Sequence, residues 1–208
     1  MNPEASCERG SASTRAFKLD GSGQWTALPP LHHARGALAL VEARQRLYAL
    51  GGNNGAVQVA PVEEYDPATN AWTDVATLPL PRNHVSGFAT GALACVAGGR
   101  NPSTARVDCL NVADHTWAQL APLPVATSGA GGGAILNEFA VVAGGEDPVE
   151  GRIIDPVQRY ANGAWTTESM LHPRHGFELA PFQGRLWACG GGDQAGLHPV
   201  ATCTSIGV

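Results

Sequence analysis

Pairs of adjacent glycines recur at a nearly fixed interval along the chain and limit its fold more than any other feature. They end four apolar segments and are separated by 47, 46 and 46 residues. The four pairs are Gly51-Gly52, Gly98-Gly99, Gly144-Gly145 and Gly190-Gly191. Self-similarity at a period of about 20–50 residues is the signature of repeat architectures, in which each unit packs on its neighbours. The sequence therefore predicts a series of similar structural units.

Other residues keep fixed places relative to the glycine pairs. A tryptophan precedes each pair: Trp25, Trp72, Trp117 and Trp165. An arginine lies 16 residues before the pair in three units, as Arg35, Arg82 and Arg174. The remaining unit has Thr127 and Ser128 near that place. We expect the paired glycines to need positive φ where backbones crowd, and the tryptophans to fill the gap between units, with Tyr65 and Tyr160 beside them.

Each unit contains four short strand signals and no sustained helical periodicity. In the first complete unit the strand signals are Ala37–Val41, Arg46–Leu50, Pro61–Tyr65 and Ala71–Val75. Turn residues separate them, which accounts for the 26 glycines and 15 prolines of the chain. Four short strands per repeat make one blade of a β-propeller. The predicted fold is therefore all-β, with four-stranded antiparallel blades.

The repeat resembles the kelch motif. The residues that carry the resemblance are Leu47 to Gly52, Val62 to Pro67, and Trp72, and the pattern covers about residues 15–206. Residues 173–177 and 190–196 are, more narrowly, similar to the last blade of bacterial six-bladed kelch proteins. In that group the chain stops after the third strand of the last blade, and an N-terminal strand bearing tryptophan closes the ring. The resemblance is specific for a fold and says little about function.

The order of strand signals leaves two arrangements of the blades open. The predicted division is a disordered lead-in at 1–14, a partial blade at 15–30, and blade units at 31–78, 79–123, 124–170 and 171–208. Arg15–Asp20 and the Trp25 segment read as third and fourth strands, while the last unit lacks a fourth. The favoured arrangement is three whole blades flanked by two partial ones, as part of a six-bladed ring. The alternative is a closed four-bladed ring in which the Trp25 strand completes the last unit.

The five cysteines are odd in number and include no CxxC motif, so a zinc site built from cysteines is not indicated. Cys95 and Cys109, like Cys189 and Cys203, are separated by 14 residues, which could place each pair on neighbouring strands. A disulfide within each pair is one interpretation. The favoured interpretation is that these cysteines are buried free thiols that act as small apolar residues.

Charge and hydropathy exclude two classes of partner. The net charge is −5 and lysines and arginines form no cluster, so nucleic-acid binding is not expected. No apolar run approaches the roughly 18 residues of a membrane-spanning helix. Residues 1–14 lack the apolar core of a secretory signal, and the sequence by itself assigns no cellular location.

The candidate binding residues lie where each innermost strand is predicted to begin, because those positions converge at the mouth of a propeller's channel. The set is Arg35, Arg82, Asn83, His84, Ser128, Arg174 and His175. Kelch binding domains use arginine and serine there, so the resemblance implies a polar ring for a carboxylate, a sugar or an acidic loop. The alternative is that the arginines brace loops between blades.

The loops after the glycine pairs supply further candidates, because variable loops on a fixed scaffold give propellers their specificity. These candidates are Asn53, Arg100, Glu146 and Asp193. Histidines also gather in the same segments, as His32, His33, His84, His172 and His175. Their spacing matches no known metal motif and no carboxylate is fixed near them by sequence, so no metal and no cofactor is assigned.

Catalysis is the weaker functional interpretation. A copper radical oxidase of this fold needs ligand tyrosines, and Tyr48, Tyr65 and Tyr160 all occupy repeat positions. Sialic-acid mutarotases share the fold, and acid–base chemistry there would need a carboxylate near an arginine in the mouth. Glu146, Asp147 and Glu178 are the carboxylates nearest that place, and no catalytic residue is assigned. The prediction is a non-catalytic scaffold that binds a protein loop or a small polar or anionic ligand, with a mutarotase-type enzyme as the alternative.

Overall fold

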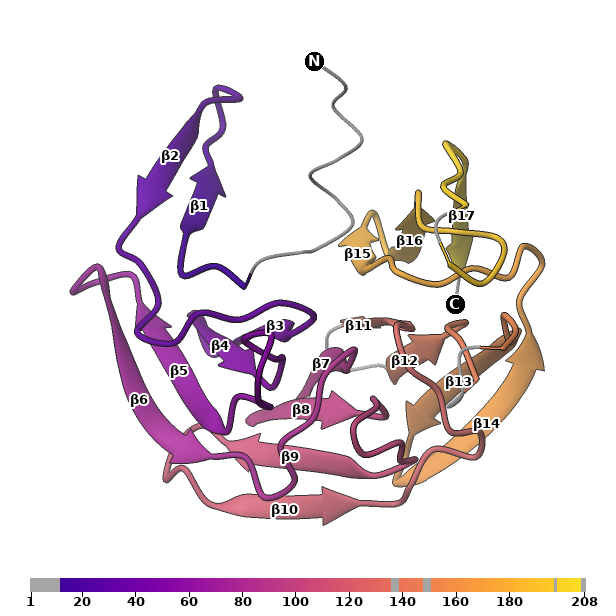
Figure 1. The fold of residues 1–208 in the computed structure, drawn as a ribbon, viewed down its shortest axis with the longest axis horizontal. Helices are drawn as coiled ribbons and strands as arrows, with labels where there is room; N and C mark the ends of the chain where they lie inside the picture. Colours follow the sequence, from indigo (N-terminus) through magenta and orange to yellow (C-terminus); the bar gives the residue numbers. More distant parts are fainter. Residues whose placement is uncertain (1–11, 136–138, 148–150, 197, 207–208) are drawn as a thin grey trace.

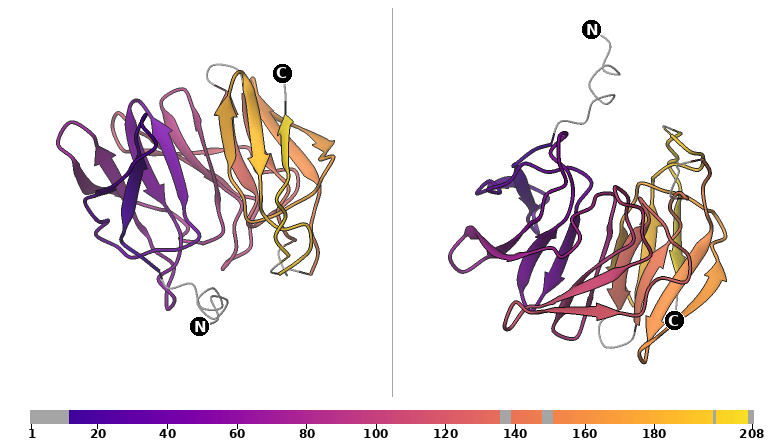
Figure 2. Two further views of the ribbon diagram at one scale, coloured as in Figure 1. Left: turned by 90° about the horizontal axis from the view of Figure 1, so that it is seen from above. Right: turned by 60° about the horizontal axis from the view of Figure 1, so that its bottom comes forward.

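The structure is a computed structural model that describes residues 12–135, 139–147, 151–196 and 198–206. The described residues form strands β1 to β17 and no helix. The strands make five antiparallel sheets that stand side by side around a central axis, as Figures 1 and 2 show. The predicted all-β propeller architecture is confirmed.

Three sheets are complete four-stranded blades, and two are partial. The first blade contains β3 (Ala39–Ala43), β4 (Arg46–Leu50), β5 (Pro61–Asp66) and β6 (Ala71–Thr77). The second contains β7 (Ser86–Thr90), β8 (Leu93–Ala97), β9 (Val107–Asn111) and β10 (Trp117–Leu120). The third contains β11 (Gly131–Ile135), β12 (Phe139–Ala143), β13 (Pro156–Ala161) and β14 (Ala164–Ser169). The partial sheets are β1 (Ala16–Leu19) with β2 (Trp25–Leu28), and β15 (Leu179–Phe182), β16 (Arg185–Cys189) and β17 (Cys203–Ile206).

The sheets form an open arc rather than a closed four-bladed ring. Strand β2 pairs with β1, and β17 pairs with β16 alone among the described strands. The two partial sheets face each other across a gap in Figure 1. Both partial sheets carry exposed apolar side chains, namely Phe17, Leu19 and Trp25 on β1–β2 and Phe182 on β15. The favoured arrangement of three whole blades between two partial ones matches the structure, and the closed four-bladed alternative does not.

Two predicted boundaries shift. Ala37 has φ of 54°, so the first strand of the first blade begins two residues later than predicted. Ser13 exchanges backbone hydrogen bonds with Arg35, and Leu31 donates to the carbonyl of Thr14 at 2.8 Å. Ordered chain therefore starts inside the predicted lead-in 1–14, whose residues 1–11 lie outside the described residues.

The glycine pairs join consecutive blades. Gly51 and Gly52 have φ of 67° and 91°, and a Cβ on Gly51 would lie 2.7 Å from the carbonyl oxygen of Arg82 in the next blade. The Gly52 N–H donates to that same oxygen at 3.0 Å. Equivalent bonds run from Gly99 to Thr127 (2.8 Å) and from Gly145 to Arg174 (2.8 Å). The predicted crowding and positive φ are confirmed, because a side chain at the first glycine would block the bond between the blades.

The repeat arginine completes the connection inside its own blade. The Arg82 side chain is fully buried and donates to the carbonyl of Gly98 at 2.6 Å and to the Asp108 carboxylate at 2.9 Å. Arg35 makes the matching bonds to Gly51 (3.0 Å) and Glu63 (2.7 Å). Arg174 bonds to the carbonyls of Gly190 and Thr202, both at 2.9 Å. Each guanidinium thus ties the end of the second strand to the third strand.

The third blade replaces this charged pair with a neutral one. Thr127 stands in the arginine's place, and its hydroxyl donates to the carbonyl of Gly144 at 2.8 Å. Gln158 stands where the first and second blades have a carboxylate, and its amide bonds to the backbone of Val125 at 2.8 and 3.0 Å. A buried charge without its partner would be costly. The arginine and the carboxylate are therefore absent together.

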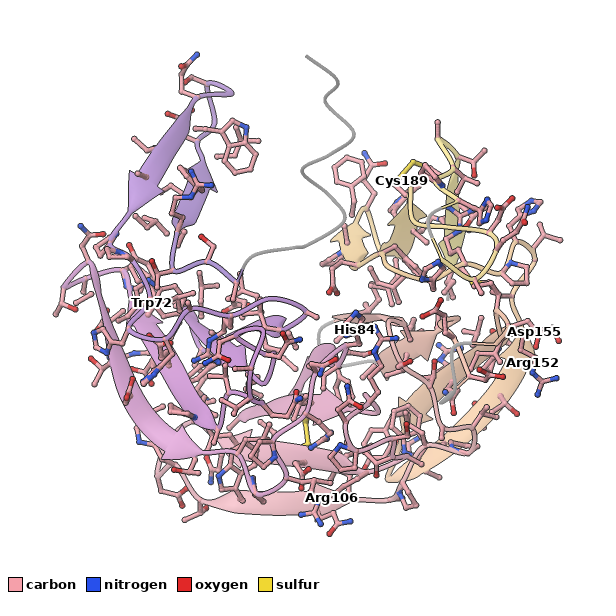
Figure 3. The ribbon with its side chains drawn as sticks, viewed as in Figure 1. Trp72, His84, Arg106, Arg152, Asp155 and Cys189 are labelled. Carbon is pink, nitrogen blue, oxygen red and sulfur yellow. A yellow bond between two sulfur atoms is a disulfide. The ribbon has the colours of Figure 1, made fainter. Side chains whose placement is uncertain are left out.

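The repeat tryptophans pack between blades as predicted. Trp72 lies 5.2 Å from the Tyr65 ring and donates to the carbonyl of Pro29 in the preceding segment at 3.0 Å. Trp165 and Tyr160 repeat the ring contact at 5.1 Å. Figure 3 places Trp72 where the first blade meets the β1–β2 sheet. Trp25 is 67% exposed, since no described blade precedes it.

Two disulfides correct the interpretation of the cysteines. Cys95 bonds to Cys109 between β8 and β9, and Cys189 bonds to Cys203 between β16 and β17. Both pairs are direct cross-strand neighbours in the sheet register. The favoured interpretation as free thiols was wrong because the separation of 14 residues places each pair opposite one another. Cys7 lies outside the described residues.

The charged pair of the second blade makes a quantitative prediction. Arg82→Thr removes the buried partner of the Asp108 carboxylate and leaves it only the partly exposed Arg106, at 2.6 Å, so we expect the free energy of unfolding to fall by about 3 kcal/mol. Arg82→Thr combined with Asp108→Gln copies the residues of the third blade and should recover much of that loss. Urea denaturation of both variants measures the difference. Equal destabilisation by the single and the double variant would contradict this account.

Candidate functional site

Short backbone bridges extend each blade beyond its innermost strand and form the mouth of the channel. The bridged pairs are Gly36 with Asn53, Asn83 with Arg100, Ser128 with Glu146, and His175 with Gly192. Two predicted groups, the strand-start residues and the loop residues, therefore meet here pair by pair. Asp193 was predicted one position too late: the last unit has three consecutive glycines, and Gly192 takes the bridging place. Asp193 is exposed on the loop that follows.

Side chains of the second blade form the first part of a polar network at this mouth. The Asn83 amide donates to the Gln58 side chain of the first blade at 2.6 Å. Arg100 donates through Nη2 to His84 Nε2 at 2.8 Å, and His84 Nδ1 lies 2.5 Å from the Asn83 oxygen. Because an arginine only donates, His84 accepts at Nε2 and carries its proton on Nδ1 as a neutral ring. Figure 3 shows His84 on the inner side of the arc.

Glu146 continues the network into the third and last blades. Glu146 is 5% exposed as a whole residue. Its carboxylate lies 3.6 Å from Arg100 Nη1 and 3.5 Å from His175 Nδ1. The other nitrogen of His175 lies 3.1 Å from the carbonyl oxygens of Gln194 and Gly196. The carboxylate thus sits between a guanidinium and an imidazole that come from the blades on either side.

Ser128 adds an unused hydroxyl beside this carboxylate. Its Oγ is buried and has no hydrogen-bond partner among the described residues. A buried polar atom that lacks a partner is unfavourable by roughly 1–3 kcal/mol, so a polar group that reached it would gain a bond. Ser128 therefore marks a point in the mouth where a ligand atom or a water would be stabilised.

The repeat arginines lie behind the mouth and present no guanidinium to it. Arg35, Arg82 and Arg174 are 3%, 0% and 2% exposed and are committed to carbonyls and carboxylates of their own blades. The prediction that they bind a ligand directly is corrected to the alternative, in which they brace the blades. The strand register supports this role. The first two blades, which have the arginine, carry Glu63 or Asp108 at one position of the third strand, and the unit without the arginine carries Gln158 there.

The channel itself holds a separate candidate group. A cavity of about 960 Å³ runs along β3, β7, β11 and β15 and is lined mainly by apolar and glycine residues, with Glu178 at its wall. The Glu178 carboxyl is open to the channel, but protein surrounds it on most sides. Loss of hydration there raises the pKa of Glu178 to about 7, and a hydrogen bond from the Gly132 backbone opposes the rise. Glu178 and Glu146 belong to different sites.

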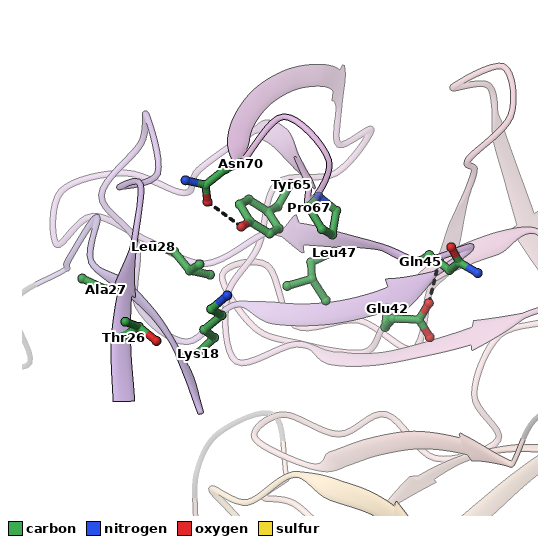
Figure 4. Close-up of a pocket in the computed structure, with 10 residues that line it drawn as sticks. All are labelled: Lys18, Thr26, Ala27, Leu28, Glu42, Gln45, Leu47, Tyr65, Pro67 and Asn70. Atoms are coloured by element: carbon green, nitrogen blue, oxygen red, sulfur yellow. Dashed lines mark hydrogen bonds between the residues drawn. The ribbon is translucent and has the colours of Figure 1, made fainter. Parts of the chain in front are cut away.

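A second cavity lies between the β1–β2 sheet and the first blade. It has a volume of about 640 Å³ and is drawn in Figure 4. Its wall includes the hydrogen bond from the Tyr65 hydroxyl to Asn70, at 2.8 Å, and the exposed side chains of Lys18 and Glu42. Among the described residues that line this cavity, no two titratable side chains point toward each other (Figure 4). The cavity is therefore a packing gap between the β1–β2 sheet and the first blade, and it is not the candidate site.

Comparison with known proteins agrees with this geometry. The family model described as the Kelch motif matches residues 34–79, which span the first blade. The chain is thus a β-propeller whose first blade carries the Kelch motif. The solved structure of YjhT superposes with a TM-score of 0.76 at 16% identity, over 93% of this chain and 77% of that one. That likeness concerns the fold of this kelch chain alone.

Curated relatives of this kelch chain are longer than it is. It is 26% identical to beta-scruin of Limulus polyphemus and 27% identical to Kelch-like protein terF of Aspergillus terreus, over 86% and 85% of its length. It spans 21% and 43% of those two proteins. A shorter match, to human Kelch repeat and BTB domain-containing protein 13, is 42% identical over 31% of this chain. Among the described residues no helix is long and apolar enough to cross a membrane.

The raised pKa of Glu178 predicts a pH-dependent stability. Because the folded pKa lies above the usual 4.5, the stabilising contribution is present below about pH 4.5 and is lost as the pH rises through about 7. Glu178→Gln imitates the protonated acid. Its melting temperature should match that of the natural chain near pH 4 and exceed it near pH 8, by calorimetry.

Glu168→Gln is the matched control, because Glu168 is an exposed carboxylate on β14. The difference in melting temperature between this variant and the natural chain should be the same near pH 4 and near pH 8. A Glu178→Gln difference that does not grow with pH would show that the channel does not hold this carboxyl in its protonated form.

Proposed function

We propose that this kelch chain is a binding scaffold whose mouth network recognises a protein loop or a small polar or anionic ligand. The observation that carries the proposal is the continuity of the network across three sheets, from Asn83 and Arg100 through Glu146 to His175. Binding sites in propellers form where loops of several blades converge on a rigid frame. The kelch repeat found here is in keeping with such a scaffold.

The chemistry of the network favours a ligand with carboxylate or hydroxyl groups. Arg100 supplies charged donors, and the buried Ser128 hydroxyl lacks a partner among the described residues. Glu146 already balances the arginine, so the mouth carries little net charge and selects by hydrogen-bond geometry as well as by charge. A ligand carboxylate would compete with Glu146 for Arg100 and His175. The ligand would therefore bind by displacing Glu146 and leave when Glu146 returns.

The alternative is a carbohydrate-directed enzyme of the sialic-acid mutarotase type. One observation favours it: Glu146 lies beside an arginine and a histidine inside the mouth, the combination that acid–base chemistry on an acidic sugar would require. Glu146 is held between two donors, which suits it to bind and orient. The scaffold remains the better-supported function because no second free carboxyl faces it in the described mouth.

Ligand titration by NMR tests the proposal. The probes are acidic sugars, small dicarboxylates and an acidic peptide. Arg100→Gln and His175→Ala should each weaken binding of a responding probe by about tenfold, the loss of one charge-assisted hydrogen bond. Binding should also fall with added salt. Exchange spectra of the sugar anomers in the same samples separate the enzyme from the scaffold, because catalysed exchange that Glu146→Gln abolishes would identify the enzyme.

Arg44→Gln is the control, since Arg44 is an exposed arginine in the turn between β3 and β4 and has no contact with the network. It should leave the affinity unchanged. Probe binding that survives both Arg100→Gln and His175→Ala in folded protein would remove the mouth network as the binding site.

A further inference from the structure

Two adjacent histidines meet an aspartate at the junction of the β1–β2 sheet and the first blade. His32 and His33 lie in the segment between β2 and β3, and Asp74 lies on the outer strand β6. His32 Nδ1 is 3.3 Å from Asp74 Oδ1, and His33 Nε2 is 2.8 Å from Asp74 Oδ2. The three side chains are 54%, 37% and 46% exposed, so an ion in solution can reach them.

Glu63 fixes the histidine segment from below. Its carboxylate accepts the backbone N–H of His32 at 2.5 Å and of His33 at 3.3 Å. The same carboxylate is held by the buried Arg35 guanidinium at 2.7 Å. The backbone of the two histidines is therefore anchored to a buried ion pair, which lowers the entropy cost of arranging the ligands.

A β-bulge in β5–β6 comes directly after Asp74. The register shifts between Val62 and Glu63, so that Glu63 stands opposite Asp74 and Val75 is left over. The matching strand pairs of the second and third blades have continuous register. Bulges redirect side chains next to functional sites. The irregularity thus occurs in the one complete blade that carries the two histidines.

The internal repeat shows that the set is assembled once among the described blades. The position of His33 is taken by Leu80, Val125 and His172 in the other units. Across from the Glu63 position, Asp74 is replaced by Gln119 in the second blade and Thr167 in the third. The scaffold does not need these ligand-type residues, because the other blades fold without them.

We propose that His32, His33 and Asp74 form a zinc-binding site. Two imidazoles and a carboxylate are ligands that Zn²⁺ accepts in a tetrahedral arrangement. Bonds of about 2.0 Å place ligand atoms roughly 3.3 Å apart, and the nitrogen of His32 and the oxygen of Asp74 have that separation, 3.3 Å. One oxygen of Glu63 also lies within 4.8 Å of these two ligand atoms. His33 lies outside this group, so its exposed ring must turn about its side-chain bonds to reach the ion.

The ion would replace the two hydrogen bonds that now join the histidines to Asp74. His32 would bind through Nδ1 and His33 through Nε2, the nitrogens that face the carboxylate. Zinc binds imidazole only in its unprotonated form, so binding weakens at acid pH. The bound ion would tie the connection from β2 to the outer strand β6 and hold the partial sheet against the first blade.

Zinc titration of the untagged chain in a Cys7→Ser background tests the site, by calorimetry and by competition with a chromogenic chelator. We expect one Zn²⁺ per chain, and no response to Mg²⁺, which prefers oxygen ligands. Asp74→Asn and His33→Ala should each lower the zinc affinity at least tenfold. His172→Ala, at the equivalent place in the last blade, should leave it unchanged.

Imidazole nitrogen spectra provide a readout that does not depend on any variant. Zinc should shift Nδ1 of His32 and Nε2 of His33 and leave the other histidines in place. Circular dichroism melts check that Asp74→Asn remains folded. Absence of stoichiometric zinc binding, unchanged affinity in folded Asp74→Asn, or zinc-dependent shifts on other histidines would each overturn the proposal.

Discussion

The structure depends on one repeated interaction, in which a buried side chain and a pair of glycines hold each blade and join it to the next. The guanidinium of Arg82 binds the carbonyl of Gly98 in its own blade, while its backbone carbonyl accepts the N–H of Gly52 from the blade before. The same arrangement recurs at Arg174 and, with a hydroxyl in place of the guanidinium, at Thr127. Because a guanidinium has five donors, it satisfies several strand-end carbonyls that a small apolar residue would leave unpaired.

This interaction determines where recognition chemistry is possible. The arginine side chains are fully bonded within their own blades. The polar groups available to a ligand therefore belong to the residues that follow these positions in the sequence, where Asn83, Ser128 and His175 pair with the loop residues. Their backbones are fixed by the bridges just described, and their side chains differ from blade to blade. A rigid frame with variable residues at one end allows ligand contacts to change without loss of stability.

Much of the fold could be predicted from the sequence, because the repeat residues have one physical reason each. The glycine pairs require positive φ, and Trp72 fills the space between blades, so both were identifiable without coordinates. The role of the arginines was harder to predict, since a spacing repeated within the chain fits a ligand site and a structural site equally. The co-occurrence of Arg82 with Asp108, and of Thr127 with Gln158, decides it, and that comparison needs the strand register.

The remaining features depend on contacts between residues far apart in the chain. The disulfides follow from cross-strand register, and His33 meets Asp74 across the junction of the segment before β3 with the outer strand β6. Neither leaves a local motif. The mouth network was only partly predicted: its members were named, but the sequence did not indicate that Glu146 would stand between Arg100 and His175.

The central claim is that the repeat arginines are parts of the scaffold. Hydrogen exchange of the arginine Nε–H groups, followed by NMR in nitrogen-15-labelled protein, tests it most directly, since Nε of Arg35, Arg82 and Arg174 each has a carbonyl acceptor in its own unit. The account predicts that these three protons exchange slowly and that their protection is unaffected by any ligand bound at the mouth. Exchange at the rate of exposed arginines, or protection that appears only when ligand is added, would contradict it.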